Sequence, residues 1–319
     1  MNWRTARRTA IYAAIAVVGG GIAYSNEAFW IQLALGVMIS AVLALSWDIL
    51  SRTGQVTLGS AAFFGLGIYA LALLEPLTGV ALAWAGSVLV CALTAMLLGM
   101  LTLRLRKMYF AIATLGLTLS LQVLVLVFKD WTGGSGGISP PVLMDGDPQL
   151  QLLVVTAVTI FGAMVSDFFL SSRLRPALFL VRTNPELAAA SGIAVVRTRI
   201  VVFTVSGVLA GICGALYGSL YGYVVPTDVF TVNWSVLPLA IAILGGMDTT
   251  LGPLLGAVLI RALEEVARAT IGGVGYQVVY GAVIILFVLL LPKGLAGLIE
   301  RIRARMGRSP LPLRCGLNN

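Results

Sequence analysis

The chain contains no histidine and only three cysteines among its 319 residues. Cys91, Cys213 and Cys315 form no CxxC pair or other spacing typical of metal ligands, and two of them lie inside apolar runs. Without histidine, neither Ser-His nor Cys-His nucleophilic catalysis is available, and the commonest metal ligand is missing. We therefore expect neither a metal-dependent nor a triad-type enzyme.

Charged residues are also scarce. They make up 11% of the chain, against about a quarter in soluble proteins, whereas 59% of the residues are apolar. This composition predicts an all-α integral membrane protein. The apolar run 10–24 follows three arginines and resembles a secretory signal only superficially, so we interpret it as a first spanning helix.

The formal net charge of +8 does not indicate nucleic-acid binding, because the basic residues lie at the edges of apolar runs and form no aromatic-interleaved face. A spanning helix needs about 20 apolar residues. Besides 10–24, the runs that qualify are 28–50, 54–74, 79–103, 109–128, 150–170, 199–224 and 276–292.

A cytoplasmic N-terminus, followed by alternation of these runs, gives a consistent topology. The predicted cytoplasmic positions are Arg52, Arg104, Arg106, Lys107 and the arginines from Arg173 to Arg199. The predicted external positions are Glu27, Glu75, Lys129, Asp130, Asp145, Asp147 and Asp228. The basic clusters therefore lie inside, as the positive-inside rule requires.

The stretch 235–268 is the one difficulty, because as a single span it places the C-terminal basic residues outside. The sequence GGMDTT at 245–250, followed by Pro253, predicts instead a broken helix whose halves are each too short to span fully. The C-terminus then lies in the cytoplasm, and the fold has about ten transmembrane or half-membrane helices. The basic residues left outside are Lys129, Arg261 and Arg268.

We expect one transmembrane domain over 1–319, with a cytoplasmic loop at 171–198 and a short cytoplasmic tail at 301–319. Segments 28–128 and 199–292 each contain four spans, but the first begins outside and the second inside. This opposite parity predicts an inverted repeat, an arrangement common in transporters.

Two glycine-rich stretches are candidates for a pathway or gating surface. The first forms one helical stripe of small residues: Gly207, Gly211, Gly214 and Gly218. Such a stripe serves close helix packing or, alternatively, a moving surface. The second stretch carries Gln55, Thr57 and Ser60, whose polar groups must find partners inside the bundle, so they line a pathway or pack within it.

No Walker sequence occurs in the chain, and WTGGSGGISPP at 131–141 lacks the lysine of a phosphate loop, so we interpret it as an external turn. An ion-coupled carrier usually needs ionisable groups at mid-membrane. Asp48 and Asp167 lie near the cytoplasmic ends of their spans, and only Asp248 is predicted to lie deeper. The sequence favours a channel-like permease that is energised by another polypeptide.

The polar interlude RTNPELAAASGIAVVRTR at 182–199 contains a short helix with its own start and stop signals. Asn184 is a suitable N-cap, Pro185 suits the first turn, Glu186 complements the helix dipole and Gly192 ends the helix. A solvated topology loop is the simpler interpretation. The small apolar side chains of this helix, which include Leu187 and Ala189, suggest instead a knob that docks on a cytosolic partner.

With these motifs in view, the chain resembles the LivM-type permease subunits of ABC importers for branched-chain amino acids. The resemblance covers nearly the whole chain. The stretches that carry it are TGQVTLGSAAFFGLGIYALALL (53–74), RLRKMYFAIATLGLTLSLQVLV (104–125), WTGGSGGI (131–138), RTNPELAAASGIAVVRTRIVVFTVSGVLAGICGALYG (182–218), AILGGMDTTLGPLLGAVLI (242–260) and VYGAVIILFVLLLPKGLAGL (279–298). One departure is Ser60, where relatives usually carry the histidine of LGHAAFFG.

The resemblance implies a permease subunit in the bacterial inner membrane, without an ATPase site or cofactor of its own. Its implied partners are a second, LivH-like permease subunit, two cytosolic ABC ATPases that bind ATP and magnesium, and a periplasmic binding protein that delivers the solute. Branched-chain or other hydrophobic amino acids are the implied solutes; urea or short amides are the alternative, and an ion-coupled secondary carrier is a further one. The implied ATPase-coupling residues are Asn184, Pro185, Glu186, Leu187, Ala189 and Gly192.

The ten-segment topology predicts that a single cysteine at Glu265 is labelled from outside and one at Arg303 from the cytoplasm, in a background without the three native cysteines. Membrane-impermeant maleimide on intact cells and on inverted vesicles measures both positions. Labelling of both residues from the same side would contradict the broken-helix interpretation.

Overall fold

The computed structural model describes residues 3–25, 27–103, 105, 107–171, 174–271 and 281. The α-helices are α1 (Trp3–Ser25), α2 (Ala28–Ser51), α3 (Ser60–Thr78), α4 (Val80–Thr102), α5 (Lys107–Val127), α6 (Lys129–Thr132), α7 (Pro148–Ser171), α8 (Leu174–Thr183), α9 (Pro185–Ala190), α10 (Val195–Tyr221), α11 (Pro226–Val229), α12 (Val232–Gly245) and α13 (Leu251–Ile271). Two 3-10 turns, η1 (Gly134–Gly136) and η2 (Leu143–Gly146), lie between α6 and α7.

Length and composition make this a multi-pass membrane protein. Seven helical segments in the described part of the chain are long and apolar enough to cross a bilayer: Ala28–Ser51, Ser60–Thr78, Val80–Thr102, Met108–Val127, Pro148–Leu170, Val195–Tyr221 and Pro226–Gly245. The expected span 276–292 and tail 301–319 lie outside the described residues. The count of ten segments, the inverted repeat and the cytoplasmic termini remain predictions.

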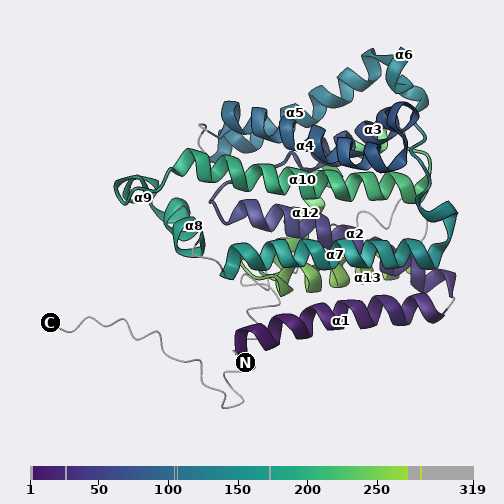
Figure 1. Ribbon diagram of the computed structural model, residues 1–319, viewed down its shortest axis with the longest axis horizontal. Helices are drawn as coiled ribbons and strands as arrows, with labels where there is room; N and C mark the ends of the chain where they lie inside the picture. Colours follow the sequence, from purple (N-terminus) through teal and green to yellow (C-terminus); the bar gives the residue numbers. More distant parts are fainter. Residues whose placement is uncertain are drawn as a thin grey trace.

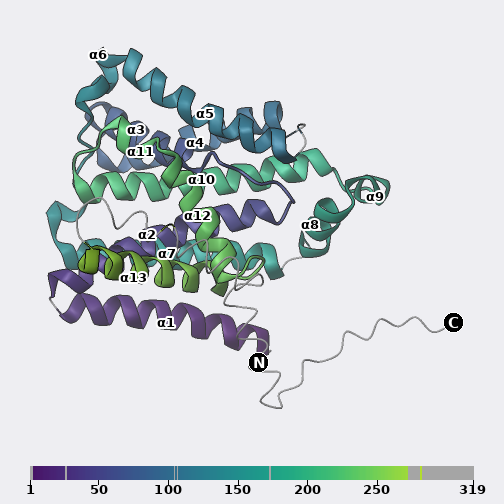
Figure 2. The same cartoon turned by 180° about the vertical axis from the view of Figure 1, so that it is seen from behind.

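The long helices lie side by side with roughly parallel axes (Figure 1). Viewed from behind, α13 runs between α1 and the central helices (Figure 2). The short helices α8 and α9 project from the end of the bundle at which α1 begins, whereas α6 lies at the opposite end. Residues of the 171–198 loop therefore share one end of the molecule with the start of α1.

The helix boundaries correct two expectations. The third span does not begin at residue 54: residues 53–59 are non-helical, and α3 starts at Ser60. This segment is held instead by long-range bonds, because the Trp47 indole N–H donates to the Thr57 carbonyl (3.0 Å) and the Leu58 N–H donates to Thr114 Oγ1 (3.1 Å). Helices α12 and α13 are separate, as the GGMDTT sequence predicts, but α13 has 21 residues and is about 30 Å long, which exceeds a half-span.

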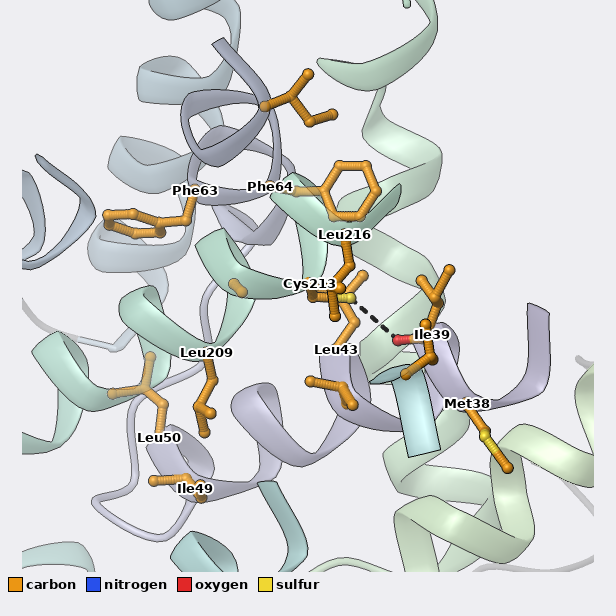
Figure 3. Close-up of a cluster of buried hydrophobic side chains, with 14 of the residues drawn as sticks. Met38, Ile39, Leu43, Ile49, Leu50, Phe63, Phe64, Leu209, Cys213 and Leu216 are labelled. Atoms are coloured by element: carbon orange, nitrogen blue, oxygen red, sulfur yellow. Dashed lines mark hydrogen bonds between the residues drawn. The ribbon is translucent and has the colours of Figure 1, made fainter. Parts of the chain in front are cut away.

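The centre of the bundle is built where α10 packs against α2, α3 and α4. A Cβ atom at Gly214 would overlap the Phe64 carbonyl oxygen of α3, and one at Gly211 would overlap Cys91 Sγ of α4. On the other face of α10, the Cys213 thiol donates to the Ile39 carbonyl of α2 at 3.2 Å, among the buried side chains shown in Figure 3. Missing side chains thus let α3 and α4 approach one face of α10, while a cysteine side chain bonds the opposite face to α2.

We predict that Gly214→Ala lowers the stability of the folded protein, whereas Gly116→Ala does not. The added methyl at 214 meets rigid backbone, and such overpacking costs about 1–3 kcal/mol. At Gly116 a Cβ meets nothing within 4 Å, so this change tests only helix propensity. Thermal unfolding of both variants in detergent measures the difference, and equal melting temperatures would contradict the packing argument.

Candidate functional site

The short helix predicted at the polar interlude is present as α9. Asn184 caps it, because its Oδ1 accepts the Leu187 N–H at 3.0 Å. Pro185 occupies the first turn, and Gly192 takes a positive φ of 81° just after the helix. Glu186, Leu187 and Ala189 are exposed to solvent, so the outer face of α9 is free for contact with another surface.

A second helix in this region was missed by the sequence analysis, which treated residues 174–183 as part of a basic loop. Helix α8 is amphipathic: Leu178 and Val181 are buried, whereas Phe179 is 66% exposed. The apolar residues Leu174, Leu178 and Val181, spaced by four and three, give the signal that could have found it. The 171–198 region therefore presents two short helices.

Arg182 of α8 joins this region to the turn between α12 and α13. Its Nη1 donates to both carboxylate oxygens of Asp248, at 2.8 and 2.7 Å, and both side chains are partly exposed. Gly54 of the α2–α3 connection packs on the Arg182 backbone. The prediction that Asp248 lies deeper in the membrane is wrong. Its turn lies at the bundle end beside α8, and its positive φ of 64° belongs to a tight reversal.

A buried ion pair lies directly beneath Asp248. The Asp248 backbone N–H donates to Asp48 Oδ1 at 3.0 Å, and the other oxygen of Asp48 binds the Arg52 guanidinium. Arg52 also donates to the Ser166 carbonyl (2.8 Å) and to Ser166 Oγ (2.7 Å) of α7. Asp48 is fully buried and Arg52 is 5% exposed, so both depend on these partners to offset the loss of water.

The network continues through α7 to α1 and α13. The Thr250 hydroxyl, just before α13, donates to Asp167 Oδ1, and the Tyr12 hydroxyl of α1 donates to Asp167 Oδ2 at 2.6 Å. The polar residues at this end thus connect helices α1, α2, α7 and α8 with the α12–α13 turn. Because these elements are bonded to one another, a displacement of α8 would change the position of each of them.

The residues predicted to line a pathway or gate lie in the packed interior of the bundle. The four glycines of the α10 stripe contact α3, α4 and the loop at Pro140, so close packing accounts for them, and a gating role stays a prediction. Thr57 Oγ1 accepts the Gly59 N–H at 3.0 Å, and Ser60 is buried at the start of α3. Gln55 is 1% exposed, and its Oε1 has no hydrogen-bond partner among the described residues.

One basic residue lies deeper in the bundle than the sequence predicts. Arg261 was expected outside, but its Nε donates to Ser40 Oγ at 2.7 Å, and Ser40 lies near the middle of the 24-residue α2. Arg268 lies two turns farther along α13 and is 53% exposed, so its expected external position stays a prediction.

The comparison with known families bears on this arrangement. The family model described as the permease component of branched-chain amino acid transport systems matches residues 29–290. The chain belongs to this family. The match includes the 171–198 region, the α12–α13 turn and all of α2 but its first residue, so the polar network of this permease lies within the family region except for Tyr12 of α1.

Three relatives are similar over most of the chain. The high-affinity branched-chain amino acid transport system permease protein LivM of Salmonella typhimurium is 30% identical over 272 residues, 75% of this chain, and LivM of Escherichia coli K12 is 29% identical over the same length. The permease spans 63% of the length of both LivM proteins. The autoinducer 2 import system permease protein LsrC of Enterobacter sp. 638 is 27% identical over 82% of this chain and 79% of its own. No solved structure matches the chain.

We predict that Asp48→Asn is far more destabilising than Asp248→Asn. Asp48→Asn removes one charge of a buried pair and leaves Arg52 uncompensated, at a cost of about 3–5 kcal/mol. Asp248→Asn removes a partly exposed pair worth about 0.2–1 kcal/mol, while its backbone bond to Asp48 and its positive φ are tolerated. Denaturant titration in detergent measures both free energies of unfolding, and a larger loss at Asp248 would contradict this ordering.

Proposed function

We propose that this permease is a transmembrane subunit of an ABC importer of the bacterial inner membrane. It translocates branched-chain or other hydrophobic amino acids, or similar small solutes, that a periplasmic binding protein delivers. It works beside a second, LivH-like permease subunit and two cytosolic ATPases, which bind the ATP and magnesium. The chain itself binds no cofactor and carries no ATPase site, in keeping with the missing Walker sequence.

The observation that carries the proposal is the capped helix α9 at the end of a buried polar network, in a chain whose family is that of a transport permease. Helix α9 has fixed ends and an exposed outer face, as a docking element for a partner requires. Its neighbour α8 is tied through Arg182 to Asp248 and from there to Asp48 on α2.

We infer from these contacts how ATP hydrolysis drives the spans. An ATPase that binds α9 displaces α8, and Arg182 transmits the displacement to the α12–α13 turn. Because Asp48 and Arg52 are buried and fully engaged, α2 and α7 move with that turn as packed bodies. The same residues that hold the bundle end together thus transmit motion from the partner to the membrane helices.

The nature of the solute rests on the relatives. Two of the three are named for branched-chain amino acid transport, and one is named for autoinducer 2 import. We favour a hydrophobic amino acid because the family description and both LivM relatives point to it. Ligand binding by the partner binding protein identifies the solute directly, and a urea-type or autoinducer-type ligand would replace this part of the proposal.

Glu186→Lys and Gly192→Val should uncouple ATP hydrolysis from uptake in the reconstituted complex. The first change reverses a charge on the exposed face of α9, and the second puts a β-branched residue at a positive φ, which shifts the end of the helix. We expect uptake per ATP hydrolysed to fall by about fivefold or more. Parallel assays of uptake and phosphate release measure this ratio.

Glu27→Lys is the matched control, since it makes the same charge change in an exposed residue at the start of α2, away from α9. Its ratio of uptake to hydrolysis should equal that of the wild type. An unchanged ratio of uptake to ATP hydrolysis in both α9 variants would contradict the coupling role of α9. Accumulation of solute by this chain alone in liposomes under an ion gradient would replace the importer with an ion-coupled carrier.

A further inference from the structure

Arg261 lies at mid-depth in the bundle, and neither the coupling network nor helix packing requires its charge there. Its Nε donates to Ser40 Oγ at 2.7 Å, and Ser40 is roughly 16–18 Å from either end of α2 at about 1.5 Å per residue. The neighbour of Ser40, Ile39, accepts a hydrogen bond from the Cys213 thiol of α10, so this part of α2 lies within the packed bundle (Figure 3). An ionised side chain at this depth is costly and usually functional.

The guanidinium is held in one orientation by two neighbours. Ser40 is fully buried and donates its own proton to the Gly36 carbonyl at 2.8 Å, so its oxygen is fixed as an acceptor for Arg261. Glu264, one turn along α13, accepts from Arg261 Nη1 at 2.8 Å and from Arg268 at 3.1 Å. Ser40 and Glu264 are therefore positioning residues for a cation on the α2-facing side of α13.

This cation keeps donors unused. A guanidinium has five N–H donors in a rigid fork, and the described residues accept from Nε and Nη1 only. The Arg261 side chain is 20% exposed, and no acceptor among the described residues bonds its Nη2. Because Nε donates to Ser40, the pair left for a carboxylate is Nη2–H with the second hydrogen of Nη1, which arginine can offer end-on in a bidentate, charge-assisted contact.

Apolar and aromatic groups pack beside the turn of α13 that carries this cation. The Tyr217 ring packs with Trp234 (centroids 5.1 Å apart) and Phe64 (5.2 Å). Trp234 also packs against the apolar cluster that contains Ile260, the residue before Arg261. A charged group beside aromatic side chains suits a small molecule with one carboxylate and one apolar side chain.

We propose that Arg261 binds the carboxylate of the transported solute as it passes the middle of the membrane, oriented by Ser40 and Glu264. This subsite rests on the proposed function, since it names the group by which this chain recognises an amino acid. The binding protein selects the solute outside the membrane, and Arg261 provides a transient binding site for the same solute within the bundle. The exposed Arg268 is excluded from this role because it lies two turns farther along α13.

The test uses the complete complex without its binding protein and measures equilibrium binding of radiolabelled leucine. Arg261→Gln should weaken binding by about 10- to 100-fold, as expected for the loss of charge-assisted hydrogen bonds. Arg261→Lys keeps the charge but not the fork, so it should retain part of the affinity. Arg197→Gln is the control, since it removes an exposed arginine at the start of α10, and it should change binding by about twofold or less.

Competition separates recognition from structure. Against wild type, 4-methylpentanoate, which keeps the carboxylate, should displace leucine better than leucinamide, which lacks it. Arg261→Gln should abolish this preference, whereas Ser40→Ala should weaken binding and keep it. Equal competition by both compounds in the wild type would overturn the subsite, as would unchanged binding in Arg261→Gln.

Two other outcomes are also decisive. If Arg261→Gln and Arg261→Lys both prevent the complex from assembling, the cluster is a subunit contact, and the subsite is wrong. A wild-type complex that imports no amino acid with its binding protein would contradict the proposed function. Import by wild type with equal import by Arg261→Gln contradicts the subsite alone.

Discussion

The loss of water inside the hydrocarbon core is the constraint on which the rest of this structure depends. Backbone groups there must bond within the chain, so the described spans are helices, and the non-helical stretch 53–59 between α2 and α3 is held by Trp47 and Thr114. The same constraint acts on charges. Asp48 and Arg52 persist in the interior because each satisfies the other and both find further partners.

In lipid, apolar side chains on their own drive little helix association, so the helices of this molecule are held together by close packing. Small residues allow that packing: Gly207, Gly211, Gly214 and Gly218 on α10, and Gly245, Gly252 and Gly256 between α12 and α13. Rigid contact at these points leaves movement to whole helices rather than to single side chains. In the proposed coupling, Arg182 and Asp248 would therefore pass a movement of α8 to packed helices as a whole.

Local signals in the sequence predicted much of the fold. Apolar runs predicted the spans of α2, α3, α4, α5, α7 and α10, GGMDTT predicted the break before α13, and the cap chemistry of Asn184, Pro185 and Gly192 predicted α9. These features depend on neighbouring residues and are therefore readable without a structure. The start of α3 was misjudged because residues 54–59 continue an apolar run, whereas Thr57 and Leu58 bond through their backbone to Trp47 of α2 and Thr114 of α5.

The polar sites resisted prediction because their partners are far apart in sequence. Asp48 and Asp248 are 200 residues apart, and Arg261 and Ser40 are 221 apart. From charge alone, Arg261 was expected outside and Asp248 was a candidate for a deeper position. Instead, Arg261 bonds to the middle of α2, and Asp248 bonds to Arg182 and Asp48 at the end of the bundle. The position of a charge along a membrane helix thus depends on which distant partner offsets the cost of its burial, and the positive-inside rule, which assigns sides to loops, does not predict it. Among the described residues Arg261 Nη2 has no acceptor, so a solute carboxylate would gain a charge-assisted bond there.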